Sequence, residues 1–161
     1  MTTKSDFTEE EWAAVLRAPI VAGMAISIAD PGGPIEVTKE LMATLRAVTD
    51  PTTETELVKS ISQEIAELTR QKKNPAGDFK PKGPVPGQQV LDEVERVARI
   101  VRAKATPEEA DAFGAWLMTV ARQAADAAKE GGFLGFGAEQ VSSGEREMLA
   151  RLGAVLGVDA T

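Results

Sequence analysis

The stretch IVAGMAISIA, residues 20–29, decides the fold class of this 161-residue chain. It is apolar on every side of a helix, which is typical of a helix surrounded by other helices. It continues a helix that begins at Thr8, where the spacing Thr8-x-x-Glu11 matches a capping box. Pro19 is expected to kink or restart this helix, because proline lacks an amide donor. We therefore expect residues 20–29 to form the centre of a helical bundle.

Apolar residues recur at helical spacing through most of the chain, and no sustained alternation of period two is present. The sequence therefore predicts an all-α fold. The length corresponds to one domain, so we expect a single-domain bundle of about six helices over residues 1–161. The five helices after the first are expected at about residues 36–48, 53–71, 88–103, 106–129 and 142–156.

The same periodicity predicts which side chains point inward. In the second helix these are Leu41, Met42 and Leu45. Gly23 and the alanines of the fifth helix are expected to let two long helices approach closely. The buried core is expected to include Trp12, Met24, Ile28, Phe113, Trp116 and Val120.

Residues 72–87 contain four prolines and three glycines, so we expect a mobile loop that has little to bury. With Arg70, this region also concentrates positive charge. Residues 70–82 hold five of the 18 basic and one of the 25 acidic residues, which leaves 13 and 24 elsewhere. Two interpretations remain open: a solvated loop, or an arm that contacts an acidic partner such as the acidic face of a second copy.

The two ends of the chain resemble each other. Thr8-x-x-Glu11 and Thr106-x-x-Glu109 each begin a long helix that is followed by a glycine-containing loop and a short helix. The short helices align as ELMATL, residues 40–45, and EMLARL, residues 147–152. The alternatives are two similar helix-loop-helix halves and a coincidence of helical periodicity.

Composition limits the chemistry. The chain has no His, Cys or Tyr, which excludes thiol catalysis, histidine triads, Cys/His zinc sites and haem ligation by His or Cys. The net charge of −7 disfavours nucleic acid and anionic membranes as partners. The longest nearly uncharged run, residues 18–29, is about half of the roughly 20 residues that cross a bilayer. Residues 1–12 contain Asp6, Glu9, Glu10 and Glu11 and therefore do not match a secretory signal. We expect a cytoplasmic protein without a membrane partner.

Several short segments carry a family resemblance. They are FTEEEW (7–12), GMA (23–25), ADPGG (29–33) and EGGFLGFG (130–137) with the following VS at 141–142. Together they resemble an uncharacterised family of small helical bacterial proteins, distantly similar to the tellurite-resistance TerB-like family. The likeness includes an acidic turn at Asp30, followed by Glu40 on the next helix. The resemblance implies a role in stress response and a contact of Asp30 and Glu40 with metal ions.

The loop that contains Gly131, Gly132, Phe133 and Phe136 is the candidate ligand or partner loop. A phosphate cradle would follow a strand or carry an adjacent lysine, and this loop does neither. Gly131 fits a helix C-cap, with the phenylalanines folded back onto the bundle. The alternative is an exposed aromatic loop that docks a partner.

Asp30, Glu36 and Glu40 are the candidate metal ligands, as an oxygen site of loose geometry. An EF-hand is excluded, because its first and twelfth loop positions would fall on Ile28 and Lys39. At the start of a helix the same acids are favourable without an ion.

No catalytic residue and no cofactor are assigned, since the clustered carboxylates fall in first helical turns, where they complement the helix dipole. The sequence predicts a non-enzymatic helical protein that acts through contacts with an unidentified protein, with a homodimer as an alternative. A second hypothesis is a small-ligand or metal-ion binding protein. Its site would lie between the Asp30 turn and the loop Gly131 to Gly137.

Overall fold

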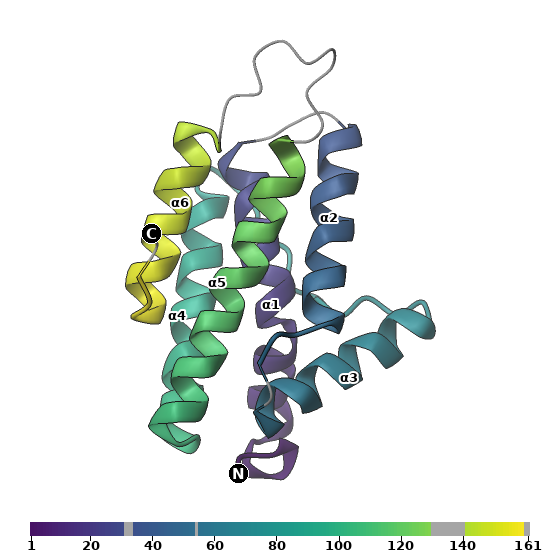
Figure 1. Ribbon diagram of the computed structural model, residues 1–161, viewed down its shortest axis with the longest axis vertical. Helices are drawn as coiled ribbons and strands as arrows, with labels where there is room; N and C mark the ends of the chain where they lie inside the picture. Colours follow the sequence, from purple (N-terminus) through teal and green to yellow (C-terminus); the bar gives the residue numbers. More distant parts are fainter. Residues whose placement is uncertain (31–33, 54, 130–140, 160–161) are drawn as a thin grey trace.

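The structure, a computed structural model, describes residues 1–30, 34–53, 55–129 and 141–159, except for the side chains of 34–36 and 129. This part of the chain forms six α-helices and no strand, which confirms the all-α bundle (Figure 1). A short 3₁₀ helix, Lys4–Asp6, precedes them. The helices are α1 (Glu9–Ala29), α2 (Pro34–Thr49), α3 (Glu56–Arg70), α4 (Pro86–Lys104), α5 (Pro107–Lys129) and α6 (Ser143–Leu156).

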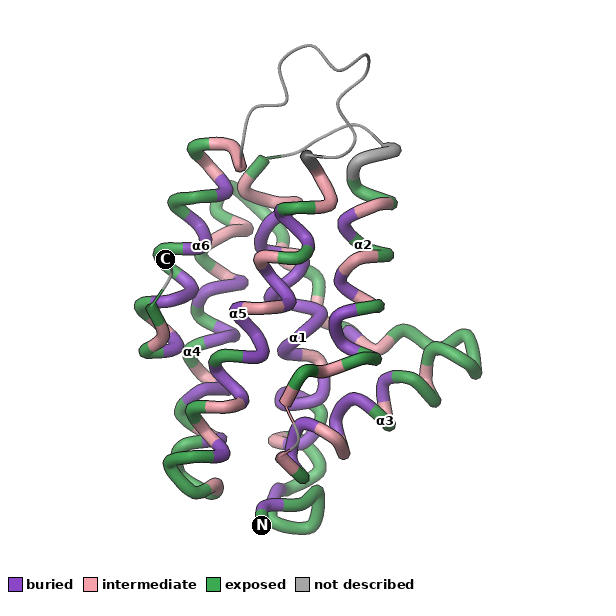
Figure 2. The backbone as a smooth tube through the Cα atoms, in the orientation of Figure 1, coloured by how far each residue is buried: buried purple, intermediate pink, exposed green. Residues whose placement is uncertain are grey.

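Helix α1 is the central helix and contacts each of the other five. Helices α2, α4, α5 and α6 run along the long axis of the molecule around it, whereas α3 lies crosswise near one end (Figure 1). Buried residues line the inner sides of these helices (Figure 2). The prediction of a surrounded helix over residues 20–29 is therefore confirmed.

Local signals set several helix ends as expected. The Thr8 hydroxyl accepts from the Glu11 amide at 3.2 Å, and the Glu11 carboxylate accepts from the Thr8 amide at 2.8 Å. The same reciprocal capping at Ser142 begins α6. Gly157 ends α6 in the left-handed region with φ 68°, which glycine adopts without strain. Pro19 does not restart the helix, since α1 is continuous from Glu9 to Ala29.

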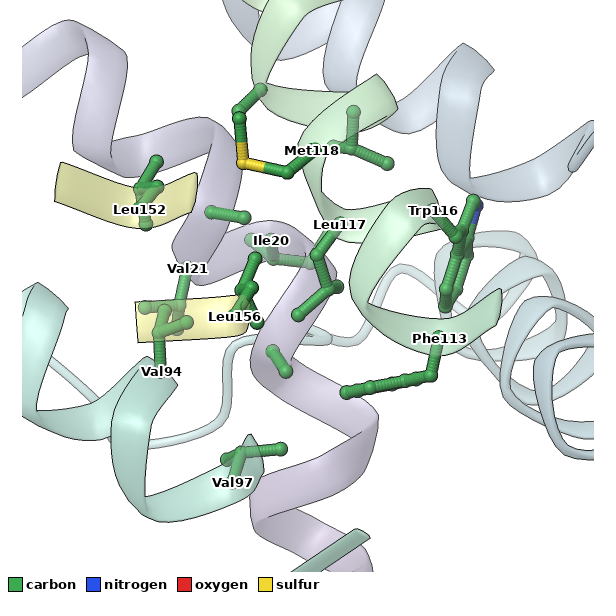
Figure 3. Packing of buried hydrophobic residues seen from close by; sticks show 14 of the residues in the cluster. Ile20, Val21, Val94, Val97, Phe113, Trp116, Leu117, Met118, Leu152 and Leu156 are labelled. Carbon is green, nitrogen blue, oxygen red and sulfur yellow. The ribbon is translucent and has the colours of Figure 1, made fainter. Parts of the chain in front are cut away.

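The core is formed mainly by side chains of α1, α3, α4, α5 and α6, and Figure 3 shows part of it from α1, α4, α5 and α6. Of the six predicted core residues, four are buried, as expected. The prediction is wrong for Met24 and Ile28, which are only partly buried. Ile28 lies in the last turn of α1 at the end of the bundle, and Met24 lies one turn earlier on the same side. The confirmed residues are Trp12, Phe113, Trp116 and Val120.

Helix α2 is oriented differently from the prediction. Leu41 and Met42 are exposed, and Leu45 is only partly buried, so the expected inward side is wrong. The residues that α2 turns toward the bundle are Glu40, Thr44, Ala47 and Val48.

The connection between α3 and α4 is irregular but packs against the bundle. Ala76 is buried and Phe79 packs against the hydrophobic core, so the expectation that this segment has little to bury is wrong. Helix α4 begins at Pro86, two residues earlier than predicted, because proline is tolerated at the first helical position. The mobility of the segment stays a prediction.

Helix α1 is long and apolar enough, by length and composition, to cross a membrane. The expectation that no apolar stretch is long enough to cross a bilayer is therefore wrong. The apolar stretch extends over residues 12–29, because Arg17 is the one charged residue within it. In the 18-residue window that passes this test, 61% of the residues are buried inside the bundle. A core helix passes the same test, so the absence of a membrane partner stays a prediction.

Candidate functional site

The contact between α1 and α2 contains a buried carboxylate. Glu40 is 2% exposed, and the Ser27 hydroxyl of α1 donates a hydrogen bond to its carboxylate. A carboxylate is costly to bury unless it accepts hydrogen bonds, so this pairing explains how α2 can turn Glu40 inward.

One helical turn along the same contact, Gly23 of α1 faces Thr44 of α2. A Cβ atom added to Gly23 would lie 2.3 Å from the Thr44 Oγ1 atom and 2.5 Å from its Cγ2 atom. The missing side chain at Gly23 therefore lets α2 approach α1 closely. The prediction that Gly23 lets α1 approach the fifth helix is wrong in its partner, because the residue that faces Gly23 is Thr44 of α2.

Helix α5 holds the other side of α2. The indole N–H of Trp116 donates to the Ala47 carbonyl oxygen at 3.4 Å, and both residues are buried. Contacts from α1 and α5 together define which side of α2 faces the bundle.

The outward side of α2 exposes three large apolar side chains as a consequence. Val37, Leu41 and Met42 are 42, 50 and 56% exposed. Val37 and Leu41 lie on the same side at i and i+4, and Met42 lies about 100° further around the helix, near the exposed residues Thr38 and Arg46. Sequence reasoning missed this surface, because the apolar period of α2 alone favours burial of Leu41. The signal that could have found it is Gly23 in the preceding helix.

The predicted metal ligands have different surroundings. Asp30 is exposed at the end of α1, where its amide donates to the Ile26 carbonyl oxygen at 3.2 Å. Glu36 lies in the first turn of α2 with its side chain outside the described residues, and Glu40 is buried against Ser27. The described residues contain no group of three acidic side chains that could hold a metal ion.

The candidate loop residues Gly131, Gly132, Phe133 and Phe136 also lie outside the described residues. The helix ends that flank this loop and the Asp30 turn lie at one end of the bundle (Figure 1). The site between the two segments stays a prediction.

Glu109, one of the carboxylates in a first helical turn, has a structural role. Its carboxylate accepts from the Thr2 hydroxyl at 2.6 Å, the Thr2 amide at 2.8 Å and the Thr106 amide at 3.2 Å. The hydrogen bonds from Thr2 are the main reason that the pKa of Glu109 is lowered to about 2. Glu109 therefore ties the N-terminal segment to the start of α5.

Glu93 forms a second polar cluster, between α1 and α4. Arg17 donates to its carboxylate through Nε at 2.8 Å, and Arg96 donates through Nε at 3.0 Å. Burial raises the pKa of Glu93, but the hydrogen bonds from Arg96 and Arg17 outweigh it and hold the pKa below its usual value. The Phe79 ring lies 5.7 Å from the Arg17 guanidinium carbon, which links this ion pair to the α3–α4 connection.

A shallow cleft of about 240 Å³ lies between α4 and α6. Ligand pockets usually measure about 300–1,000 Å³, so this cleft is small for a metabolite. Arg151 spans it and donates to the Gln88 side chain at 2.6 Å. The lining residues are Gln88, Leu91, Asp92, Glu95, Arg151, Ala154 and Val155.

In comparisons with known proteins, no family model, no curated protein and no solved structure matches the chain. The TerB-like resemblance therefore stays a prediction from the quoted segments.

Proposed function

We propose that the protein acts without catalysis, through protein–protein contacts made by the outward side of α2. The observation that carries this proposal is the inverted orientation of α2. Among the described residues, five large hydrophobic side chains are well exposed, and three of them, Val37, Leu41 and Met42, lie on this one helix. Exposed apolar side chains that gather on one surface mark interaction sites, whereas scattered ones do not. A role in stress response rests on the TerB-like resemblance alone.

The occupant that fits this surface is a second copy of the chain. An antiparallel pair of α2 helices, with its two-fold axis between residues 41 and 42, would place Leu41 of one copy against Met42 of the other. Among the side chains described in α2, no acidic one is exposed, and Arg46 is an exposed cation. At 1.5 Å per residue the two Arg46 positions would lie about 13 Å apart along the axis. That separation exceeds the Debye length of about 8 Å at physiological salt, so their repulsion is largely screened.

The expected dimer is weak. Complete burial of a Val, Leu or Met side chain contributes about 1.5–3 kcal/mol. These side chains are already about half buried, so six of them contribute roughly 5–8 kcal/mol. The loss of translational and rotational freedom costs about 4–15 kcal/mol. At the favourable ends of these two ranges the net free energy of association is about −4 kcal/mol, which corresponds to a dissociation constant of about 1 mM.

The chain has no cysteine, so an introduced cysteine provides a single reporter thiol. Met42→Cys places thiols of two copies near the two-fold axis, and we expect a disulfide-linked dimer on mild oxidation. Val85→Cys is the matched control, because Val85 is 58% exposed but lies outside α2. Equal cross-linking of the two variants would contradict the proposal.

Sedimentation velocity provides the second measurement. The wild-type chain should show a rising sedimentation coefficient up to about millimolar concentration, near the expected dissociation constant. Leu41→Lys with Met42→Lys should remain monomeric, and Val85→Lys should behave as wild type. A wild-type chain that is monomeric throughout would overturn the homodimer.

The alternative of a metal or small-ligand site rests on Glu40, a buried carboxylate at the end of the bundle where α2 begins. A ligand at about 100 times its dissociation constant stabilises a protein by about 2.7 kcal/mol. Thermal unfolding with millimolar Ca²⁺, Mg²⁺ or Mn²⁺ tests the metal site. A stabilisation that Glu40→Gln removes would support it, and no shift with any ion would contradict it.

A further inference from the structure

Residues 70–82, which we term the basic segment, hold five basic residues and one acidic residue, while the rest of the chain has a net charge of −11. All five cations are exposed. Among the residues that the structure describes, Lys72, Lys73, Lys80 and Lys82 form no ion pair. Arg70, through its hydrogen bond, and Lys73, through its charge, help to lower the pKa of Glu67. The described part of the chain gives no such partner for Lys72, Lys80 and Lys82.

The backbone of the basic segment is held against the bundle. Ala76 is buried, and the ring of Phe79 packs on the core and over Arg17. Near the end of the segment, the Lys82 amide donates to the Gln89 side chain at 3.1 Å, and Gln89 donates in return to the Lys82 carbonyl oxygen. The lysines thus project from an anchored backbone, which lowers the entropy lost when a partner binds.

Lys72 occupies a position that favours glycine. It has φ 58°, and it follows the end of α3 in a Schellman arrangement. Its amide donates to the Thr69 carbonyl oxygen and the Lys73 amide donates to the Leu68 carbonyl oxygen, both at 2.9 Å. A Cβ atom is strained in this backbone conformation, so a cation is present where glycine would be favoured.

The dipole of α4 does not explain the positive charge of Lys80 and Lys82. They precede the N-terminal end of α4, whose first turn has no acidic residue. Positive charge near this end of a helix is unfavourable, whereas an approaching carboxylate is stabilised. No acidic side chain of the first turn of α4 therefore offsets the charge of this end of the helix.

We propose that the basic segment binds a short acidic segment of a partner protein, a run of Asp and Glu side chains. A short acidic run needs to contact only exposed lysines of this segment, which carries four of them with one acidic residue. A nucleic acid or an anionic bilayer extends further and would be repelled by the remaining net charge of −11. This surface is separate from α2 and does not depend on self-association.

Fluorescence anisotropy with a labelled octapeptide of alternating Asp and Glu tests the proposal on the full chain. We expect binding at 50 mM NaCl that weakens at least about tenfold at 300 mM, because exposed charges are screened by salt. Lys80→Gln with Lys82→Gln should weaken binding at least about fivefold. Arg46→Gln with Arg99→Gln removes two exposed cations outside the segment and should leave the affinity within about twofold.

Lys72→Gly separates an effect on peptide binding from an effect on folding stability. It removes the positive charge and also relieves the backbone strain at this position. We expect its melting temperature to be equal to or above that of wild type while peptide affinity falls about two- to threefold. Leu41→Lys with Met42→Lys should still bind the peptide, which distinguishes this proposal from the α2 homodimer. Tighter binding of a 20-nucleotide single-stranded DNA or of phosphatidylserine vesicles would overturn the proposal. Unchanged affinity in the lysine variants would overturn it as well.

Discussion

Helices α2 and α6 carry the same short pattern but turn opposite sides of it toward the bundle. In α6, the pattern EMLARL over residues 147–152 behaves as its periodicity predicts. Met148, Leu149 and Leu152 are buried, and Glu147 is exposed. The apolar side of this helix thus covers the core.

In α2, the pattern ELMATL over residues 40–45 has the reverse exposure. Glu40 is buried, whereas Leu41 and Met42 are exposed. The two sequences align position by position, but the first three aligned residues lie in opposite environments. Similar amphipathic sequences therefore do not define which way a helix is rotated.

The difference follows from what each helix packs against. Thr44 of α2 sits on Gly23 of α1, so a polar side chain fills the space above that glycine. In α6, it is Met148 that lies over a glycine, Gly87 of α4, where an added Cβ would be 3.2 Å from the Met148 Cε atom. A small residue on the opposing helix thus selects which side chain is covered.

The largest effect is expected for Trp116→Ala, because this side chain holds α2 against α5. Truncation of a buried tryptophan costs about 3–5 kcal/mol of unfolding free energy. Urea unfolding measures it, and Thr119→Ala, on a partly exposed side of the same helix, should remain within about 0.5 kcal/mol of wild type. A Trp116→Ala variant of wild-type stability would show that α2 is not held by this contact.

The second prediction compares aligned residues directly. Met148→Ala and Leu149→Ala should each cost about 2–5 kcal/mol, because both side chains are buried. Leu41→Ala and Met42→Ala should each lie within about 0.5 kcal/mol of wild type when measured on dilute protein. Equal losses in the two helices would mean that α2 buries its leucine side after all.

The third prediction concerns the two glycines. Gly23→Ala should destabilise by about 1–3 kcal/mol, because the added methyl group overlaps the Thr44 side chain. Gly87→Ala should stay within about 0.5 kcal/mol, because its tight contact is with the flexible end of Met148 and its contact with Ile28 at 3.7 Å is an ordinary one. Gly23→Ala combined with Thr44→Ala should recover part of the loss, and no recovery would contradict the proposed contact.

The smallest effect concerns the N-terminal ends of α5 and α6. Glu109 at the start of α5 and Glu145 at the start of α6 each form a capping box, but Glu109 also accepts from Thr2. Its pKa of about 2 lies below the ordinary 4.5, so its contribution to stability is present above pH 4.5 and is lost as the pH falls toward 2. Thr2→Val should flatten this dependence in urea unfolding between pH 2 and 5. An unchanged slope in Thr2→Val, with exposed Thr52→Val as control, would contradict the role of the Thr2 hydroxyl.

Most of the fold could be predicted from the sequence, because the deciding signals are local. The capping residues Thr8 and Ser142 and the terminal glycine Gly157 satisfy backbone groups within one helical turn. In α4, the six apolar residues that recur at helical spacing are all buried. They are Val90, Leu91, Val94, Val97, Ala98 and Val101.

The candidate site could be predicted only in part. Glu40 was selected as an acidic residue of interest, but its burial and its partner Ser27 depend on how α2 packs on α1. The position of the basic segment was evident from its charge, whereas its anchoring through Phe79 was not.

The sequence by itself determined where the helices form and which of them is central, because capping, proline tolerance and apolar period act between neighbouring residues. Only the tertiary structure decided the rotation of α2, and with it the exposure of Leu41 and Met42. That rotation depends on the contact of Thr44 with Gly23, a residue of another helix. The close packing of two helices is a property of their combined surfaces, which neither helix specifies alone.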